Sequence, residues 1–381
     1  MGMPKLAKVG KSIFISAGDV SGDIHASGLI RQITHLEPEL RWSGLGGPLM
    51  ASAGCKLLVS PEEEAVMGFR KVIGKIPHYF MLLAHIAEFL KSSRPSAVIL
   101  VDYPGLNMRI AAMAKRLGLP VFYFICPQYW AWAPWRVKNF SRFIDLALVI
   151  FPFEEPYFKM HGINSRYIGH PVCDRQGNDL IEKEAECHLP DGDILALLPG
   201  SRRQEIISNL PVMIEAAKVI LEKRPKWTTV LTHYDQGLLE VAQEIARNHH
   251  FPLTTLCGGM KKVARAARFC LVGSGTATLE VAFTKTPMVV VYRTSPLACK
   301  LAPLLLTVPY FCQVNLMAGQ KLVPEVLCSN DDPTPLLSQA LPLIVEDSLR
   351  DRLHNRLCAF SEKYNRPGAL TKAAHLILES F

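Results

Sequence analysis

The residues best suited to bind an anion lie in small-residue turns in the second half of the chain. After an apolar run that ends at Val272, the sequence Gly-Ser-Gly-Thr at 273–276 leads into residues of helical character that include Glu280. A small-residue turn that opens a helix presents free backbone N–H groups and the positive end of the helix dipole, which suits a phosphate. The same turn could instead serve only close packing of a strand and a helix, and this stretch alone leaves both interpretations open.

A second turn, Pro-Gly-Ser-Arg at 199–202, follows a predicted strand and precedes a predicted helix. Its backbone amides and the guanidinium of Arg202 could face a diphosphate, and each charge-assisted hydrogen bond contributes about 1.5–3 kcal/mol. Glu280 could accept hydrogen bonds from a ribose diol, as acidic residues do in dinucleotide-binding folds. Asn315 lies in a third turn, where polar residues are followed by small ones. Together these turns predict a site for a nucleotide diphosphate leaving group held without a metal ion.

One acidic residue of the first half occupies a position typical of ligand contact. Asp102 directly follows the apolar run 97–101, a predicted buried strand. Open α/β sheets bind their ligands at the carboxyl ends of the strands, so Asp102 could act as a general base on an acceptor hydroxyl. Such a base accelerates a reaction by roughly 10²–10⁴-fold. The alternatives are that Asp102 caps a turn and that Arg202 forms an ion pair between domains.

The elements that position these residues alternate between strand and helix. This pattern predicts an α/β protein of two doubly wound, Rossmann-like domains that face each other across a cleft. We expect domains at 1–170 and 171–345, followed by C-terminal helices at 346–381. The strands are expected at 12–16, 97–101, 121–125, 146–150, 194–198, 228–232, 253–256, 269–272 and 288–292.

Composition narrows the class of partner. The chain has 381 residues, a net charge of +8 and 49% apolar residues. A basic balance fits nucleic acid, phosphorylated ligands or an anionic membrane surface. The basic residues are dispersed and no RRM, KH or helix-turn-helix signature is present, which disfavours nucleic acid. The absence of a Walker A motif and of a clean GxGxxG fingerprint disfavours a P-loop ATPase and a dehydrogenase, and we expect no cofactor.

The cysteines and the apolar segments indicate a cytosolic chain. Ten cysteines occur without a CxxC pair, so we expect buried free thiols in a reducing compartment and no zinc site. No secretory signal is expected at the N-terminus. The most apolar late segment, 301–311, is well short of the roughly 18 residues that span a bilayer.

Two segments leave a packing role and a binding role open. Apolar residues at 66–90 recur at near-helical spacing, interrupted by Pro77, with Arg70, Lys71 and Lys75 among them. A core helix with a basic edge is the favoured interpretation, and a surface for a membrane or an acylated ligand is the alternative. The segment 127–136 contains three of the five tryptophans, which either pack a domain face or line a groove.

An ordered set of motifs extends along nearly the whole chain and resembles one family. The motifs are SAGDVSGDIHASGLI from Ser16, GLGGPLM from Gly44, VMGF from Val66, VDYPGLN from Val101, PQYWAWAPWRV from Pro127, FPFEEPYF from Phe151, IGHPV from Ile168, LLPGSRRQEI from Leu197, GSGTATLEVAFTKTPMVVVYR from Gly273 and NLMAG from Asn315. Each motif is weak alone, whereas the ordered set is specific. The chain is similar to the bacterial lipid-A-disaccharide synthases, glycosyltransferases of the two-domain GT-B fold.

The resemblance implies a reaction and its substrates. It implies transfer of 2,3-diacylglucosamine from a UDP donor to the 6-hydroxyl of 2,3-diacylglucosamine 1-phosphate, which forms a β-1,6 linkage with inversion and without metal. It also implies a cytoplasmic enzyme on the inner-membrane surface. The C-terminal helices at 346–381 are implied to pack back on the first domain of the same or a partner chain, with a homodimer of swapped C-termini as one arrangement. A related UDP-GlcNAc enzyme, a 2-epimerase or a peptidoglycan-type transferase, is the enzyme alternative, and a basic nucleic-acid-binding module is the non-enzyme alternative.

The family pattern transfers to individual residues. Asp102 matches the candidate base, and Arg202 and Asn315 match an essential arginine and an essential asparagine. The residues that match substrate-binding positions are Asp19, Ser21, Gly22, Gly200, Ser201, Ser274, Gly275, Thr276 and Glu280. Those that match the acyl-chain and membrane region are Val66, Met67, Phe69, Arg70, Lys71, Ile76 and Phe80. The chain departs from the pattern at Lys71, where many members carry glutamate, and at Cys328, where many carry glutamine.

Overall fold

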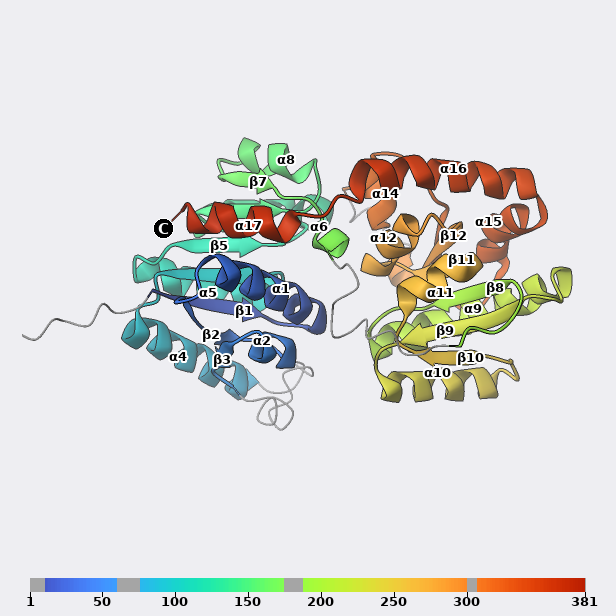
Figure 1. Cartoon of the computed structure of the whole chain (residues 1–381), viewed down its shortest axis with the longest axis horizontal. Coiled ribbons are helices and arrows are strands. Elements are labelled where there is room, and N and C mark those ends of the chain that lie inside the picture. The colour runs from blue at the N-terminus through green and yellow to red at the C-terminus, as the bar shows by residue number, and fades with distance from the viewer. Residues whose placement is uncertain (1–10, 60–75, 175–187, 300–306, 381) are drawn as a thin grey trace, which may run out of the picture. The chain divides into compact units, whose positions relative to one another are not determined.

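The computed structural model describes residues 11–59, 76–174, 188–299 and 307–380. Its contacts divide the chain into two compact units (Figure 1). Unit 1 consists of Met1–Asp174 and Pro367–Phe381, and unit 2 consists of Arg175–Arg366. Each unit is a parallel sheet covered by helices, so the predicted α/β class with two Rossmann-like domains is confirmed.

Unit 1 contains a seven-stranded parallel sheet in the order β3-β2-β1-β4-β5-β6-β7. The strands are β1 (Ser12–Ala17), β2 (Arg41–Leu45), β3 (Cys55–Leu57), β4 (Ala97–Val101), β5 (Val121–Phe124), β6 (Leu146–Val149) and β7 (Ser165–Tyr167). The strand order reverses between β1 and β4, which pair from Ile13 with Ala97 to Ala17 with Val101. The turns that leave these two strands therefore lie side by side, at the switch point where open α/β sheets bind ligands.

The helices of unit 1 are α1 (Val20–Leu36), α2 (Pro48–Ser52), α4 (Ile76–Ser93), α5 (Pro104–Arg116), α6 (Tyr129–Trp132), α7 (Val137–Phe140), α8 (Glu154–Met160) and α17 (Ala369–Leu378). Side chains from α4, α5, α7 and α8 share one hydrophobic core on one face of the sheet. Leu82, Ile86 and Leu90 of α4 belong to it, which confirms the core interpretation for this part of 66–90. Pro77 lies in the first turn of α4, where no intrahelical hydrogen bond is lost. The rest of that segment, 66–75, lies outside the described residues.

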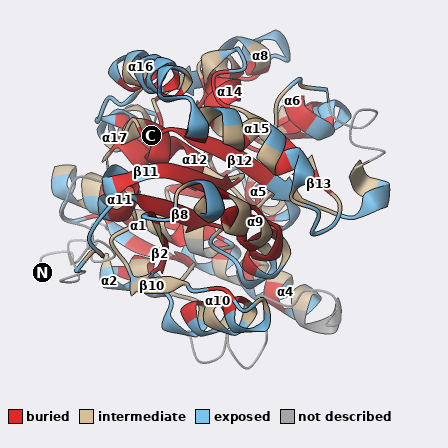
Figure 2. Cartoon of the chain, turned by 90° about the vertical axis from the view of Figure 1, so that its right-hand side faces the viewer, coloured by how far each residue is buried: buried red, intermediate tan, exposed pale blue. Residues whose placement is uncertain are grey.

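Unit 2 contains a six-stranded parallel sheet in the order β10-β9-β8-β11-β12-β13. The strands are β8 (Ile194–Leu198), β9 (Thr228–His233), β10 (Thr254–Cys257), β11 (Ala267–Gly273), β12 (Met288–Arg293) and β13 (Glu325–Cys328). The helices are α9 (Arg203–Lys223), α10 (Gln236–Asn248), α11 (Met260–Ala266), α12 (Thr276–Phe283), α14 (Gln313–Ala318), α15 (Thr334–Val345) and α16 (Asp347–Tyr364). Figure 2 shows the central strands as buried and the outer sides of the helices as exposed. The strand order reverses between β8 and β11.

Each predicted strand is present within two residues of its expected ends. The strands that were not predicted are short or lie toward the sheet edges. β3 and β7 have three residues each and only one buried residue, so no apolar run marks them in the sequence.

The structure divides residues 346–381 between the two units, whereas all of them were predicted to pack on the first domain. Helix α16 packs within unit 2, where the rings of Phe283 and Phe360 stack with their centroids 5.9 Å apart. Only α17 packs on unit 1, against α1. The first break follows Asp174 instead of residue 170, because residues 171–174 also belong to unit 1.

Asp174 holds α17 in place from a distant part of the sequence. Its carboxylate accepts hydrogen bonds from the backbone N–H groups of Gly368, Ala369 and Leu370. These groups open α17, so Asp174 supplies the cap that the helix start needs. The side chain of Leu370 lies over Gly28 of α1, where an added Cβ would come within 2.9 Å of it.

Replacing Asp174 with alanine is expected to destabilise the docking of α17 by about 1–2 kcal/mol, because three N–H groups lose their acceptor. Amide hydrogen exchange in 369–378 measures this effect. The matched control is Asp235→Ala, which removes the cap of α10 in unit 2, where Asp235 accepts from Leu238 N–H. Equal exchange of α17 in both variants would contradict the assigned role of Asp174.

Candidate functional site

Asp102 lies at the switch point of unit 1, next to the turn that begins α1. Because Ala17 pairs with Val101, residues 18 and 102 leave neighbouring strand ends. The two turns are in close contact, since a Cβ added to Gly18 would lie 2.2 Å from the Tyr103 ring. Asp19 and Asp102 therefore belong to one loop cluster.

The backbone at Asp102 is held in a conformation that L-residues rarely adopt. Asp102 and Tyr103 have φ angles of 45° and 47°. Left-handed backbone at such residues costs on the order of 1 kcal/mol each and persists only where the surroundings enforce it. The Asp102 carbonyl accepts hydrogen bonds from the Tyr123 hydroxyl (2.6 Å) and from the Asn107 amide (2.7 Å). These contacts set the direction in which the Asp102 carboxylate leaves the sheet.

Tyr123 and Asn107 are positioning residues that the sequence analysis missed. Asn107 is fully buried, accepts a hydrogen bond from the Ser16 hydroxyl (2.8 Å) and donates to the Val101 carbonyl (3.0 Å), so it joins β1 to β4. Burial raises the pKa of the Tyr123 hydroxyl well above its usual range, with a smaller contribution from Asp102, so the hydroxyl remains a donor. Tyr123 lies inside the predicted strand 121–125 and Asn107 ends the VDYPGLN motif, and nothing in the sequence marks either of them as a support of Asp102.

Asp19 and Asp23 organise the N-terminal turn. Asp19 caps α1 by accepting from Gly22 N–H at 2.7 Å, which places Ser21 and Gly22 in the first turn of that helix. Asp23 is buried and accepts from the N–H groups of Gly47, Leu49 and Met50 at 2.9–3.1 Å. The two small-residue turns of the first half, 17–22 and 44–48, are thereby joined.

A buried carboxylate fixes the tryptophan-rich segment of unit 1. Glu154 is fully buried and accepts from Trp130 Nε1–H (2.9 Å), Ile150 N–H (3.0 Å) and Phe151 N–H (2.9 Å). The Trp130 ring is packed edge-on against Phe153 with centroids 4.7 Å apart. Trp130 therefore packs within the unit, whereas Trp132 and Trp135 are exposed.

The stability of unit 1 is expected to depend on pH through Glu154. Burial raises the pKa of Glu154 to about 7, and the three hydrogen bonds oppose that rise. Between its unfolded pKa and about pH 7 the folded state binds more protons than the unfolded state, so stability falls as pH rises, by up to about 3 kcal/mol. Unfolding of the wild type and of Glu154→Gln at pH 5 and pH 8 measures this effect. A pH dependence that is identical in the two proteins would contradict it.

The two turns of unit 2 that were predicted to bind an anion lie next to each other. Leu198 of β8 pairs with Val272 of β11, so residues 199 and 273 leave adjacent strand ends. A Cβ added to Gly273 would lie 2.3 Å from the Pro199 carbonyl oxygen. Asn209 ties this region together, because its amide donates to the Pro199 carbonyl (2.7 Å) and its oxygen accepts from Arg293 N–H (2.9 Å). The pairing of β8 with β11 thus brings two of the three predicted turns together within unit 2.

The backbone N–H groups of the 199–202 turn were predicted to face a diphosphate, but in the structure two of them donate to a side chain of the protein. Glu205 accepts hydrogen bonds from the N–H groups of Ser201 (2.8 Å) and Arg202 (3.2 Å), so these groups are satisfied within the protein. A Cβ at Gly200 would lie 2.3 Å from the same carboxylate, and the φ of Gly200 is 137°. The Arg202 side chain is 65% exposed and lies 3.7 Å from Glu205. The guanidinium, more than the backbone, is therefore the group of this turn that could bind an anion.

His233 supports the same turn and was not predicted. Its Nδ1 accepts from Asp235 N–H at 2.9 Å, so its Nε2 carries the proton and donates to the Ser201 carbonyl at 3.2 Å. The ring of Tyr234 stacks on His233 with centroids 4.5 Å apart.

The 273–276 turn leads directly into α12. Ser274 donates through its N–H to the Val291 carbonyl and through its hydroxyl to the Phe311 carbonyl. Gly275 is the N-cap of α12, and among the described residues no side chain forms a cap hydrogen bond there. Thr276 begins the helix, so its dipole is directed at this turn. Glu280 follows on the second turn of α12 and is buried.

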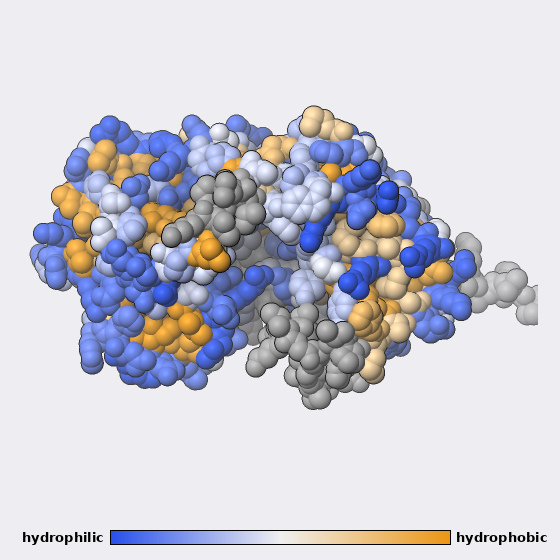
Figure 3. Space-filling view, turned by 180° about the vertical axis from the view of Figure 1, so that it is seen from behind, coloured by the Kyte–Doolittle hydropathy of each residue, from blue (hydrophilic) through white to orange (hydrophobic). Residues whose placement is uncertain are grey.

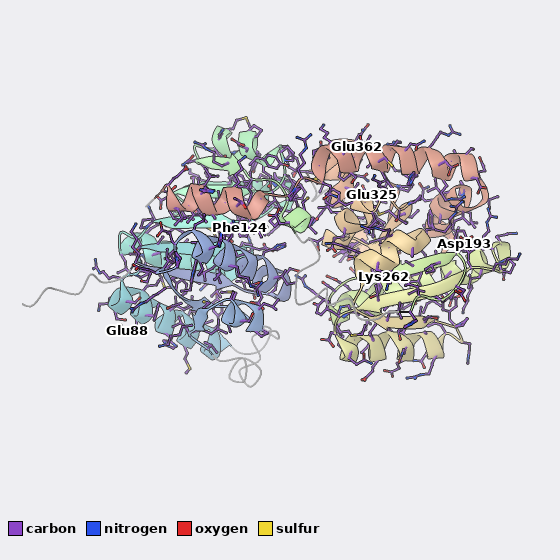
Figure 4. The ribbon with its side chains drawn as sticks, in the orientation of Figure 1. Glu88, Phe124, Asp193, Lys262, Glu325 and Glu362 are labelled. Carbon is purple, nitrogen blue, oxygen red and sulfur yellow. The ribbon has the colours of Figure 1, made fainter. Side chains whose placement is uncertain are left out.

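Asn315 is buried within unit 2, where it supports neighbouring backbone. Its side-chain oxygen accepts from Leu322 N–H (2.8 Å) and Val323 N–H (2.9 Å), and its amide donates to the Val323 carbonyl (2.9 Å). Glu325, labelled in Figure 4, accepts from Cys312 N–H at 2.8 Å. Burial raises the pKa of Glu325, and hydrogen bonds from Cys312 and Asn315 oppose that rise. In this arrangement Asn315 orders the loop after α14.

The structure describes only part of the predicted acyl-contact set. Val66, Met67, Phe69, Arg70 and Lys71 lie outside the described residues, and Ile76 is described only as the first residue of α4. Phe80 on the same helix is 56% exposed.

The other sequence predictions concern cysteines, metals and membrane spans. The nine described cysteines are free and six are buried, as predicted. Among the described residues no group of three or more His, Cys, Asp or Glu side chains is arranged to hold a metal ion. None of the described helices has the length and apolar character needed to cross a membrane.

Comparison with known proteins places the chain in a family. The sequence model described as "Lipid-A-disaccharide synthetase" matches residues 13–377. The lipid-A-disaccharide synthase of Acidobacterium capsulatum is 34% identical over 386 residues, which cover 97% of this chain and 96% of that protein. The corresponding protein of Geobacter sulfurreducens is 33% identical over 96% of both chains.

Solved structures share the fold at low sequence identity. The glycotransferase of kitacinnamycin has a TM-score of 0.62 at 15% identity and covers 97% of this chain and 98% of its own. The S. aureus MnaA structure with UDP also has a TM-score of 0.62, at 13% identity, with 95% and 94% covered. These likenesses support the two-domain GT-B fold. The family match and the identities to the named relatives show that this chain belongs to the lipid-A-disaccharide synthase family and is a glycosyltransferase.

Proposed function

We propose that this chain transfers 2,3-diacylglucosamine from its UDP donor to the 6-hydroxyl of 2,3-diacylglucosamine 1-phosphate. The products are the β-1,6-linked disaccharide 1-phosphate and UDP. The observation that carries the proposal is the family match from residue 13 to residue 377. The position of Asp102 at the switch point of unit 1 supports it.

The proposed roles rest on the family resemblance and are supported by the position of each residue within its unit. Asp102 removes the proton from the acceptor 6-hydroxyl as its oxygen attacks C1 of the donor sugar. The bond from C1 to the UDP oxygen breaks, and UDP leaves with the electron pair, so the configuration at C1 inverts. Arg202 and the start of α12 stabilise the charge that develops on the diphosphate.

The remaining site residues contact the substrates or support the loops that do. Glu280 accepts from the ribose hydroxyls of UDP, and Ser274, Gly275 and Thr276 surround its phosphates. Asp19, Ser21 and Gly22 form the acceptor side of the site in unit 1. Asn315 contributes by holding the loop at 322–323, because its side chain is committed to that backbone.

We also propose a cytoplasmic enzyme that associates peripherally with the inner membrane, since both substrates carry acyl chains. The segment 66–80 supplies one contact, and the exposed Phe80 supports this assignment. A homodimer with exchanged α17 helices is compatible with the capping by Asp174, which a partner's α17 can receive in the same way.

The experiment that tests the function is release of UDP from UDP-2,3-diacylglucosamine, measured with and without 2,3-diacylglucosamine 1-phosphate. We expect release that depends on the acceptor and no conversion of UDP-GlcNAc. Epimerisation of UDP-GlcNAc at C2, or UDP release that is independent of any acceptor, would overturn the proposal in favour of a related UDP-sugar enzyme.

A further inference from the structure

One arginine of unit 1 lies close to Asp102 and has no role in the site described above. Arg109 is exposed on α5, the helix that follows the Asp102 turn. The guanidinium forms no ion pair with a carboxylate of any residue that the structure describes. The turns that leave β1 and β4, residues 18–22 and 102–108, contain no lysine or arginine. Arg109 is therefore the first basic residue that follows Asp102 in the chain.

The Arg109 side chain extends back toward the start of α5. Side chains on a helix tilt toward its N-terminus, and residues four apart share one face. The Arg109 guanidinium lies over the ring of Tyr79, 5.1 Å from its centroid. The Tyr79 hydroxyl in turn donates to the carbonyl of Gly105, in the first turn of α5, at 3.2 Å. The guanidinium therefore lies by the first turn of α5, at the edge of the sheet where Asp102 also lies.

Tyr79 holds the guanidinium in this position. It lies in the first turn of α4, which packs against α5, and it is partly buried against the hydrophobic core of unit 1. Burial raises the pKa of the Tyr79 hydroxyl, the charge of Arg109 opposes that rise and Tyr103 adds to it. The hydroxyl therefore stays protonated and keeps its bond to Gly105. A ring fixed in this way orients the planar guanidinium and leaves its N–H donors to a ligand.

Tyr103 supplies a second polar group at the same place. It follows Asp102 directly, and its ring lies against Gly18. Its hydroxyl has no hydrogen-bond partner in the part of the chain that the structure describes. Tyr79 bonds to Gly105, two residues after Tyr103, so the two phenol rings are neighbours. A carboxylate, a free hydroxyl and an unpaired cation thus lie on one edge of unit 1.

We propose that Arg109 and the Tyr103 hydroxyl bind the phosphate on C1 of the acceptor sugar. This phosphate lies within one sugar ring of the 6-hydroxyl, so one acceptor molecule can reach both Arg109 and Asp102. The guanidinium suits a phosphate because two of its N–H groups can donate in parallel. Its charge also offsets the repulsion between the phosphate and the Asp102 carboxylate. The inference deepens the proposed function, and it rests on that function because the ligand is the proposed acceptor.

The position of Arg109 favours the acceptor over the donor as the source of the phosphate. The donor carries a diphosphate, and unit 2 has its own exposed cation, Arg202, for that group. Arg109 instead shares unit 1 with Asp102, the proposed base. From behind, unit 1 shows hydrophobic patches beside hydrophilic residues (Figure 3). A ligand that carries both acyl chains and a phosphate suits such a mixed surface.

The experiment measures binding of two acceptor forms to the full chain by isothermal titration calorimetry in detergent micelles. The ligands are 2,3-diacylglucosamine 1-phosphate and 2,3-diacylglucosamine, which lacks the phosphate, and UDP is titrated in parallel. The test variants are Arg109→Gln, Arg109→Lys and Tyr103→Phe. The matched control is Arg116→Gln, which removes the same charge from the exposed far end of the same helix.

We expect the wild type to bind the phosphorylated acceptor about 10–150-fold more tightly than the form without phosphate, the range for a charge-assisted contact. Arg109→Gln should lose this preference, and Arg109→Lys should keep part of it. Tyr103→Phe should reduce the preference by roughly 2–12-fold, since one hydrogen bond is lost. Arg116→Gln should keep the preference. A wild type that lacks the preference, or an Arg109→Gln variant that keeps it, overturns the proposal.

The ratio of the two affinities distinguishes a binding role from a structural one. A substitution that only disturbs α5 weakens both acceptor forms alike and leaves their ratio unchanged, and this outcome for Arg109→Gln overturns the proposal. The affinity for UDP should be the same in the wild type and in Arg109→Gln. A loss of UDP affinity as large as the loss of acceptor affinity would assign the guanidinium to the donor diphosphate and overturn the proposal as well.

Transfer measured with the same proteins separates this inference from the proposed function. Transfer by a wild type that binds both acceptor forms equally refutes the phosphate site alone. A preference that depends on Arg109, without any disaccharide formed, refutes the reaction alone.

Discussion

Replacing Asp102 with asparagine is expected to lower kcat by roughly 10²–10⁴-fold, the contribution of a well-placed general base. The donor KM should change little, because the turns that we propose bind UDP lie in unit 2. The substitution keeps the shape of the side chain and leaves the Asp102 carbonyl to accept from Tyr123 and Asn107. The loss should therefore reflect the missing proton acceptor and not a collapsed turn.

The pH profile distinguishes a base from a structural acid. The wild type should lose kcat at acidic pH as Asp102 becomes protonated, and Asp102→Asn should lack this limb. Glu88→Gln is the matched control, since Glu88 is an exposed acid of the same unit on α4 (Figure 4). Turnover of Asp102→Asn close to that of the control would remove Asp102 as the base.

Replacing Arg202 with glutamine is expected to lower kcat/KM by roughly 10–150-fold, because one charge-assisted contact to the diphosphate contributes about 1.5–3 kcal/mol. The structure strengthens this expectation. Glu205 occupies the N–H groups of Ser201 and Arg202, so the exposed guanidinium carries most of the positive charge of the turn. Arg202→Lys should recover only part of the loss, since lysine lacks the planar fork.

The neighbouring arginine supplies the control for this prediction. Arg203 is exposed at the first position of α9, so Arg203→Gln removes the same charge one residue away. We expect this control to change kcat/KM by no more than a few-fold. Equal losses in the two glutamine variants would indicate a general electrostatic effect and contradict a specific contact by Arg202.

The fold was largely predictable because its central strands are long apolar runs. β4 and β8 were predicted with the ends they have, since each run is bounded by residues that break it. The three-residue edge strands β3 and β7 lack such a run. Helix α16 was assigned to the wrong unit because its partner Phe283 is 77 positions before Phe360, and helical periodicity does not identify a partner.

The site was predictable where a single motif contains the functional group. The turns at 199–202 and 273–276 were expected to converge, and β8 and β11 are neighbours. The supports of Asp102 were not predictable, because Tyr123 reaches it from 21 residues away and Asn107 joins it to Ser16 across 91 residues. Glu205 could have been recognised, since an acidic residue at the third position of a helix commonly accepts from the residues before it.

The central claim is that the chain joins two acylated glucosamine units through a β-1,6 bond. Mass spectrometry and NMR of the product formed from UDP-2,3-diacylglucosamine and 2,3-diacylglucosamine 1-phosphate test it most directly. The account predicts one product with the mass of the tetraacylated disaccharide 1-phosphate, a β-anomeric coupling and a linkage to C6. Absence of a disaccharide, an α-linkage or attachment at another hydroxyl would contradict it.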